Sequence, residues 1–295
     1  MLTLDHLMEI AERHRSDLQF KVAEFAIGQT EFHFNTNPYL MGVINLSPDS
    51  WYRESVCLNT EKAIERGFLL QTQGASIVDI GAESTLMNAE ILDVSTQQSR
   101  LLPVVQELAR AGVIVSIETY EPEIARRCLE MGAKVLNVTG NLHIEELSRM
   151  AVDHDAAMIL CHVQGSHVRQ VDDYDLSKES TGMLLESFER LIERATSQGN
   201  QKLFIDPGQG FYYRNLQDSE KRVRHQMDVF LNTFRLRRLG YPVCHALPHA
   251  FEKFGEEVRC AEPFFAVLAA IGKTSLFRTH EVPRVRAVLE TLGLY

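Results

Sequence analysis

The stretch YLMGVINLSPDSWYRESVCLNTEKAIERGFLLQTQGASIVDIG, residues 39–81, holds one complete strand–helix–strand unit. It begins with a β-rich apolar run, YLMGVIN (39–45), that ends in a polar residue. Apolar side chains at helical spacing follow over 60–73, and a second β-rich run, SIVDIG (76–81), completes the unit. Two strands joined through a helix run parallel, because the crossover returns the chain to the same edge of the sheet. The stretch therefore predicts an α/β fold built on a parallel sheet.

The same pattern continues to the C-terminal end of the sequence. Further strands are predicted at 113–119, 134–140, 156–163, 202–208, 242–248 and 274–282. Further helices are predicted at 96–111, 121–131, 143–153, 180–197, 218–238, 262–272 and 284–293. Strands that alternate with helices through so many units favour a closed (β/α)8 TIM barrel over an open doubly wound sheet.

The residues before the first of these strands predict two additions to the barrel. The apolar residues of 4–11 have helical spacing, so we expect an N-terminal helix over roughly 4–24 that packs outside the barrel. FAIGQTEFHFN (25–35) alternates on either side of Gly28-Gln29, which predicts a hairpin that plugs the bottom of the barrel. The expected organisation is a helical extension over 1–24 and a TIM barrel over 25–295.

Composition narrows the class of protein. A chain of 295 residues with 45% hydrophobic residues can bury a large single core. Its net charge of -10 repels phosphate backbones and anionic lipid, so we expect neither a nucleic-acid nor a membrane partner. The five cysteines are scattered and lack CxxC spacing, which argues against a disulfide framework and a zinc knuckle. The sequence shows no signal peptide and no apolar run of membrane-spanning length. We expect a cytoplasmic protein with reduced thiols.

Polar residues stand at or just past the ends of the predicted strands. They are Asn45, Asp79 with Glu83, Glu118, Asn137, His162, Asp206, His245, and Arg278 with His280. The C-terminal ends of barrel strands meet at one mouth, where enzymes of this architecture place their catalytic groups. Any single member could instead cap the next helix, as a strand-end Asn or Asp often does. We expect the ring as a whole to form the functional site.

Seven strings in order give the site a chemical identity. They are MGVINLSPDS (41–50), GASIVDIGAEST (74–85), SIETYEPEIA (116–125), AKVLNVTG (133–140), ILCHVQG (159–165), IDPGQGF (205–211) and RTHEV (278–282). Together they resemble the dihydropteroate synthase family of pterin-binding TIM barrels, over residues ~25 to 293. The resemblance implies a transferase of folate biosynthesis that uses Mg²⁺. Such an enzyme joins the amine of p-aminobenzoate to a dihydropterin pyrophosphate and releases pyrophosphate.

The resemblance assigns the catalytic roles. A carboxylate at Asp206 can accept from the ring N–H and the amino group of a pterin together, while the Asn137 amide both donates and accepts. Glu118 stands where the family has a pterin-contacting Asp. Arg278 and His280 would form an anion site for the departing pyrophosphate. Two structural alternatives remain open: Asp206 in an Asp-Pro-Gly turn, and Arg278 paired with a neighbouring acid such as Glu281.

The resemblance also assigns the substrate-binding residues. Asn45 resembles the residue that helps to hold Mg²⁺ and pyrophosphate, and one amide oxygen suits a magnesium ion that keeps most of its waters. The hydroxyls and carboxylate of Ser47, Asp49 and Ser50 follow it. Thr85 matches a residue near the phosphates and the amine substrate. The remaining members of the predicted set are His162, Gly208, Phe211 and His249.

The sequence departs from the family pattern inside this site. Glu118 replaces an Asp, and Val138 follows Asn137 directly where the family has a further Asp. Leu86 replaces an Arg, and Leu247-Pro248-His249-Ala250 replaces a Ser-Arg-Lys-Ser segment whose Lys contacts both substrates. Each lost cation could reduce the rate of a phosphate-handling site on the order of 10²-fold.

Two other functions stay open, the first supported by these departures and the second by the Asp and Asn pterin contacts that it shares. One is a pterin-binding paralogue without synthase activity, and the other is a folate-dependent methyltransferase that passes a methyl group to a corrinoid protein. Relatives often dimerise through their outer helices, so a homodimer is also open. PFFAVLAAIG (263–272) is apolar enough to form such a face, but we expect it to pack on the barrel.

Overall fold

The computed structural model describes residues 1–295 except 48–54, 58, 84–91, 175–178 and 212. Its central sheet consists of parallel strands in the order β10-β7-β6-β5-β4-β3-β12-β11. A bridge between Ile205 and Val243, with the Ile205 N–H donating to the Pro242 carbonyl at 3.1 Å, joins the two outer strands of this order and closes the barrel. The strands are β3 (Tyr39–Asn45), β4 (Ile77–Gly81), β5 (Val115–Thr119), β6 (Val135–Val138), β7 (Ala157–Cys161), β10 (Leu203–Asp206), β11 (Cys244–Ala246) and β12 (Leu276–Thr279). The predicted TIM barrel is confirmed.

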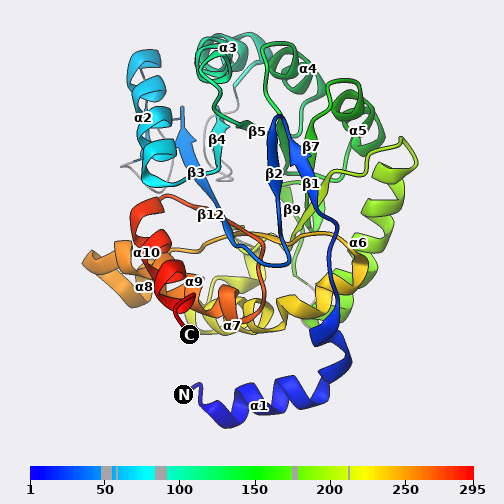
Figure 1. The fold of residues 1–295 in the computed structure, drawn as a ribbon, viewed down its shortest axis with the longest axis vertical. Helices are drawn as coiled ribbons and strands as arrows, with labels where there is room; N and C mark the ends of the chain where they lie inside the picture. Colours follow the sequence, from blue (N-terminus) through cyan, green and yellow to red (C-terminus); the bar gives the residue numbers. More distant parts are fainter. Residues whose placement is uncertain (48–54, 58, 84–91, 175–178, 212) are drawn as a thin grey trace.

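A ring of helices surrounds the barrel (Figure 1). Side chains of Asn59, Asp93 and Asp218 accept backbone N–H bonds at the first turns of α2, α3 and α7, which fixes where those helices begin. The helices are α2 (Thr60–Gln73), α3 (Val94–Arg110), α4 (Pro122–Glu130), α5 (Ile144–Asp153), α6 (Ser180–Thr196), α7 (Ser219–Leu236), α8 (Phe251–Phe254), α9 (Ala261–Ile271) and α10 (Val282–Leu292). Short 3₁₀ turns lie at η3 (Arg214–Leu216), η4 (Arg237–Leu239) and η5 (Gly255–Cys260). The short helix α8 and the turn η5 were not predicted.

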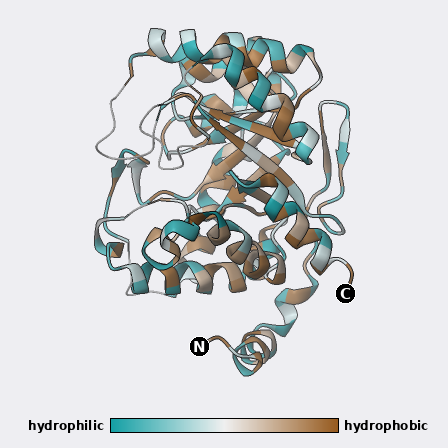
Figure 2. Ribbon diagram, turned by 90° about the vertical axis from the view of Figure 1, so that its left-hand side faces the viewer, coloured by the Kyte–Doolittle hydropathy of each residue, from teal (hydrophilic) through white to brown (hydrophobic). Residues whose placement is uncertain are grey.

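The hydrophobic core has an inner and an outer part. Figure 2 shows hydrophobic strands enclosed by helices of mixed polarity. Alternate strand residues such as Met41, Ile159 and Phe204 fill the barrel interior. The intervening residues, such as Ile44 and Ile117, pack against the helices. Helix α9 belongs to this outer layer, because Phe265, Ala266 and Leu268 are buried, so the expected packing of 263–272 on the barrel is confirmed.

The predicted hairpin is present and plugs the N-terminal end of the barrel. β1 (Phe25–Ile27) pairs with β2 (Thr30–Phe32) across a two-residue turn in which Gly28 has φ 60°. The rings of Phe25 and Phe34 lie 5.2 and 5.1 Å from the ring of Phe204 inside the barrel. The aromatic side chains of the hairpin thus seal the end opposite to the mouth.

The predicted N-terminal helix is too long. Helix α1 covers Leu4–Arg13, a 3₁₀ turn η1 covers Arg15–Gln19, and 20–24 is not helical. The helical spacing of apolar residues stops at Ala11, and the polar run that follows gives a longer helix nothing to bury. Figure 1 shows α1 outside the barrel, as expected.

Three further features complete the description of the fold. A small hairpin, β8 (Gly165–His167) with β9 (Gln170–Val171), follows β7 and was not predicted. All five cysteines are free thiols. None of the helices in the described residues combines the length and the apolarity needed to cross a membrane.

Candidate active site

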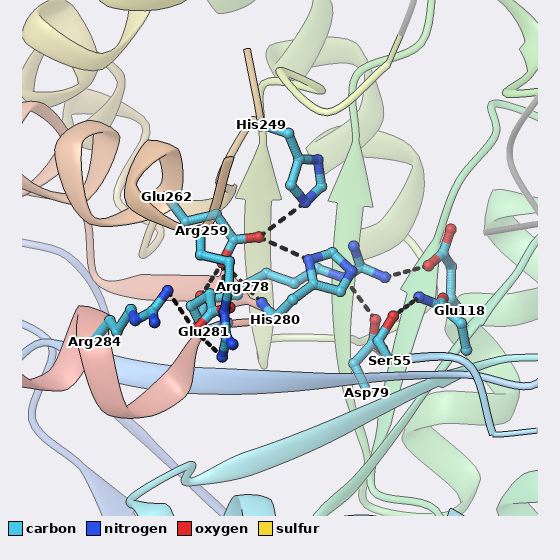
Figure 3. A network of polar contacts seen from close by, with 12 residues as sticks. Ser55, Asp79, Glu118, His249, Arg259, Glu262, Arg278, His280, Glu281 and Arg284 are labelled. Carbon is cyan, nitrogen blue, oxygen red and sulfur yellow. Dashed lines mark hydrogen bonds and ion pairs between the residues drawn. The ribbon is translucent and has the colours of Figure 1, made fainter. Parts of the chain in front are cut away.

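Arg278, at the end of β12, lies between two acids from neighbouring strands (Figure 3). Its Nε donates to Asp79 Oδ2 at 2.7 Å, and its Nη2 donates to Glu118 Oε2. Burial opposes the charge of the guanidinium, but Glu118 and Asp79 outweigh it and raise the pKa of Arg278 above its ordinary value. Arg278 is thus paired with acids, as the structural alternative expected, but the partners are Asp79 and Glu118, while Glu281 pairs with Arg259 at 2.5 Å.

Asp79 links the strands β4, β5, β6 and β12. It is fully buried, and it accepts from Ser116 Oγ at 2.6 Å and from Asn137 Nδ2 at 3.1 Å in addition to Arg278. The amide of Asn137 is held at its other end as well, since its Oδ1 accepts from Cys161 Sγ at 3.3 Å. These side chains meet because every second residue of a strand faces the barrel interior. Asn137 is therefore fixed in orientation before any ligand binds.

Asp206 ends β10 on the opposite wall of the same interior. Its Oδ1 accepts from the Gly208 N–H at 2.8 Å, so the Asp-Pro-Gly turn considered above is formed. Gly208 has φ 73°, and a Cβ at that position would lie 2.3 Å from the His162 carbonyl oxygen, so only glycine fits there. Burial raises the pKa of Asp206 to about 6. The turn engages one carboxylate oxygen and holds the side chain towards the barrel axis.

Glu118 shows what the extra methylene of a glutamate does at the end of β5. The longer side chain reaches across the mouth to the guanidinium of Arg278. Burial raises the pKa of Glu118 to about 7, and the charges of Asp79 and Asp206 add to this while Arg278 opposes it. One guanidinium thus faces three buried carboxyl groups, and Glu118 is the member that takes up a proton near neutral pH.

A second polar cluster lies beside Arg278 and consists of His249, Glu262 and His280 (Figure 3). Glu262 Oε1 lies 2.7 Å from His280 Nδ1 and 3.2 Å from His249 Nε2. Burial favours the neutral form of Glu262, but His280 and His249 outweigh it and lower the pKa of the carboxyl below its ordinary value. Burial lowers the pKa of His280. His249 and His280 therefore share one carboxylate.

Two histidines of the predicted ring do not face the mouth. His162 Nδ1 lies 2.8 Å from Ser187 Oγ in α6, and His245 Nε2 lies 2.8 Å from Thr233 Oγ1 in α7. Burial lowers their pKa values to about 4 and about 3, so both rings are neutral. The expectation that the whole ring converges is wrong for these two. The inward positions of β7 and β11 belong to Cys161 and Cys244, and the next residue of each strand points outward.

The remaining predicted residues lie around this centre. Asn45 Nδ2 donates to Ser55 Oγ at 2.6 Å, beside the mouth end of β4. Phe211 packs against the interior cluster next to Gly208. Thr85 and Leu86 lie outside the described residues, as do Asp49 and Ser50.

Several residues of the site have roles that were not predicted from the sequence. Asp79 was placed in the polar ring without a role, although an acid inside the apolar run SIVDIG signals a buried partner. Ser116 and Cys161 gave no comparable signal, because small residues in a strand are common in a core. Glu262 begins a helix, where an acid is ordinarily explained by the helix dipole.

Comparison with known proteins adds independent information. The family model described as "Pterin binding enzyme" matches residues 41–247. Dihydropteroate synthase of Streptococcus pyogenes is 28% identical over 273 residues, which cover 89% of this chain and 97% of that protein. Dihydropteroate synthase of Thermus thermophilus, solved with 4-aminobenzoate, is 25% identical with a TM-score of 0.75, covering 92% of this chain and 100% of that one. The Clostridium difficile enzyme, solved in the presence of pteroic acid, is 25% identical with a TM-score of 0.74, covering 90% and 99%.

Proposed function

Since this chain belongs to the pterin-binding enzyme family, we propose that it is a dihydropteroate synthase of folate biosynthesis. In this reaction the amine nitrogen of p-aminobenzoate forms a bond to the methylene carbon of a dihydropterin pyrophosphate. The bond between that carbon and the pyrophosphate oxygen breaks, and the amine loses a proton. The observation that carries the proposal is the convergence of Asp206, Asn137 and Arg278, from three strands, in one buried site.

Asp206 and Asn137 have the chemistry to recognise a pterin. Carboxylate oxygens accept from the ring N–H and amino group, and the Asn137 amide offers a donor and an acceptor to the other edge. Asp206 and Asn137 are almost fully buried, at 4% and 3% exposure. A ligand that left one of their polar atoms, or one of its own, without a hydrogen-bond partner would therefore bind weakly. Preorganisation supports the role, because Asn137 is held by Asp79 and Cys161 and Asp206 by Gly208. These bonds reduce the reorganisation that binding requires.

Arg278 is the residue that would meet the departing pyrophosphate. Its Nε and Nη2 are used by the two acids, and within the described part of the chain its Nη1 has no hydrogen-bond partner. A planar guanidinium with donors left over can bind a phosphate oxygen while its acidic partners keep it in place. When Glu118 is protonated, more of the positive charge of Arg278 is available to the anion. Arg278 would thereby stabilise the charge that develops as the carbon–oxygen bond breaks.

Magnesium is the cation that the family resemblance implies, and Asn45 fits it. Asn45 Nδ2 donates to Ser55 Oγ, which orients the amide, and the amide oxygen Oδ1 is the kind of ligand atom that a hard cation prefers. Asn45 would hold the ion at the mouth end of β3. When bound there, Mg²⁺ would neutralise charge on the phosphates of the substrate.

Residues 25–295 would carry this activity, with 1–24 as an extension outside it. The partners would be a pterin pyrophosphate and an aromatic amine, in line with the 4-aminobenzoate and pteroic acid in the solved relatives. Five reduced thiols suit the cytoplasm as the compartment. The side chain of His162 contacts α6, so His162 would act on the site through its carbonyl oxygen, which leaves no room for a Cβ at Gly208.

A synthase assay tests the proposal. Purified protein is incubated with dihydropterin pyrophosphate, p-aminobenzoate and Mg²⁺, and dihydropteroate is measured by liquid chromatography. We expect product with the wild type and a loss of at least about 10²-fold with Asp206→Asn. Absence of product above an enzyme-free control would overturn the proposal. Pterin binding without turnover would then support the alternative of a paralogue that lacks synthase activity. Methyl transfer from methyl-tetrahydrofolate to a corrinoid acceptor would support the methyltransferase reading.

A further inference from the structure

The cluster of His249, Glu262 and His280 has the composition and the geometry of a metal site. Each residue offers one ligand atom, and the three atoms all lie within 4.8 Å of one another. Figure 3 shows the two imidazole rings directed at the same carboxylate from the loop after β11 and from the end of β12. The ring centroids of His249 and His280 are 5.1 Å apart, so both rings can approach one ion from neighbouring directions.

The carboxylate is held in one orientation by bonds to its other oxygen. Glu262 Oε2 accepts from the His280 N–H at 2.9 Å, from the Glu281 N–H at 3.1 Å and from the Thr279 hydroxyl. Oε1 is therefore the oxygen directed at the imidazoles. Hydrogen bonds to a ligand residue are characteristic of metal sites in proteins, because they orient the ligand atom before the ion binds.

The distances fit a small ion after a slight expansion. Bonds of 2.0–2.1 Å in a tetrahedral sphere place neighbouring ligand atoms roughly 3.3 Å apart. The two imidazole nitrogens lie 3.2 and 2.7 Å from Glu262 Oε1, so the ion requires an outward shift of a few tenths of an ångström on the His280 side. Two imidazoles and one carboxylate form a ligand set that selects transition metals over Mg²⁺, which prefers oxygen.

We propose that His249, Glu262 and His280 bind one first-row divalent transition-metal ion of the Zn²⁺ class. The site is separate from the magnesium position at Asn45 and does not depend on the proposed synthase reaction. Three protein ligands leave a fourth position for water or an anionic group. The side chains of His249 and His280 are 13% and 10% exposed while Glu262 is 1% exposed, so this position opens on the side of the imidazoles. The metal charge would lie beside Arg278, two residues from His280.

Metal titration of the full chain tests the site without any activity assay. The purified protein is stripped with a chelator and titrated with Zn²⁺ by calorimetry, and with Co²⁺ by visible absorption, with excess Mg²⁺ present throughout. We expect one ion per chain and the intense absorption bands of tetrahedral Co²⁺. His249→Gln should weaken binding by more than the 10–100-fold typical of outer-shell changes. The matched control is His143→Gln, which alters an exposed His–Glu pair 3.7 Å apart.

A second variant separates loss of the site from loss of the fold. Glu262→Gln keeps one oxygen for the three donors and removes the charge that the ion needs. Circular dichroism and urea unfolding identify the variants that remain folded, and His249→Gln, on a loop, is expected to be among them. Failure of the wild type to bind Zn²⁺ and Co²⁺ would overturn the proposal. Equal affinity of the wild type and a folded His249→Gln variant would also overturn it.

Discussion

Replacement of Arg278 by Gln probes the centre of the site. The substitution removes the guanidinium that joins Asp79 and Glu118 while it keeps a polar side chain of moderate length. Asp79 is fully buried, and among the described residues it retains only the neutral donors of Ser116 and Asn137. A buried carboxylate that has lost its cation destabilises the folded state strongly, because its charge is no longer compensated.

The size of the effect follows from this geometry. A unit charge pair about 4 Å apart at an effective dielectric constant of about 20 is worth about 4 kcal/mol. Glu118 can avoid being a buried unpaired charge by taking up a proton, since its pKa is already raised to about 7. Asp79 carries the rest, so we expect Arg278→Gln to lower the free energy of unfolding by about 3–5 kcal/mol. This is a large part of the roughly 5–15 kcal/mol typical of a folded domain.

Urea unfolding followed by circular dichroism measures this loss. At a slope of about 2–3 kcal/mol per molar urea, the midpoint should fall by roughly 1–2 M. The double variant Arg278→Gln/Glu118→Gln should recover part of the stability, because it removes one of the unpaired acids. The control Arg286→Gln breaks an exposed pair with Glu290 and should cost less than about 1 kcal/mol. A loss below about 1 kcal/mol for Arg278→Gln would refute the assignment of a tight buried network.

Three further predictions concern protonation, backbone strain and the hairpin. Stability should fall between about pH 4 and about pH 7, because burial raises the pKa of Glu118 to about 7 and that of Asp206 to about 6. Their contribution is complete below the ordinary pKa values of 4.5 and 3.8, and it is lost as the pH rises through the raised values. Urea titrations across this range should show a flatter profile for Glu118→Gln, and an unchanged profile would contradict the raised pKa. Ala250 has φ 44°, so Ala250→Gly should raise the melting temperature through a gain of about 1 kcal/mol, and a lower melting temperature would argue against strain there. Phe34→Ala should cost about 3–5 kcal/mol in urea unfolding, because its ring packs on Phe204, whereas the exposed Phe20→Ala should cost little; similar losses would contradict the plug.

Much of the fold follows from periodicity in the sequence. The alternation of β-rich runs with helical spacing identified the barrel, and Gly28-Gln29 identified the hairpin turn. The end of α1 was misplaced, because apolar spacing at Leu4–Ala11 was extended into a polar run that buries nothing. The short helix α8 after β11 was not predicted, because it begins after Ala250, whose backbone is left-handed. Alanine rarely adopts this conformation, so the sequence gives no signal of it.

The candidate site was predictable in position but not in pairing. Polar residues at strand ends located the mouth, and Asp206, Asn137 and Arg278 do converge there. The sequence could not show that Arg278 reaches across to Glu118, because pairing across a barrel depends on register and side-chain length. Side chains alternate between the barrel interior and the helices along a strand, so a shift of one position decides whether His162 and His245 face the mouth. The amino-acid composition does not show which of the two directions applies.

The most direct test of the account is a calorimetric titration with a pterin, applied to the wild type and to Asp206→Asn. Asparagine keeps an oxygen for the Gly208 N–H but presents an amide donor to the donor edge of the pterin. The control is Asp153→Asn, on the exposed end of α5. We predict one pterin per chain for the wild type and the control, and an affinity lower by about 10–100-fold or more for Asp206→Asn. Equal pterin affinity in all three proteins would contradict a pterin site on Asp206.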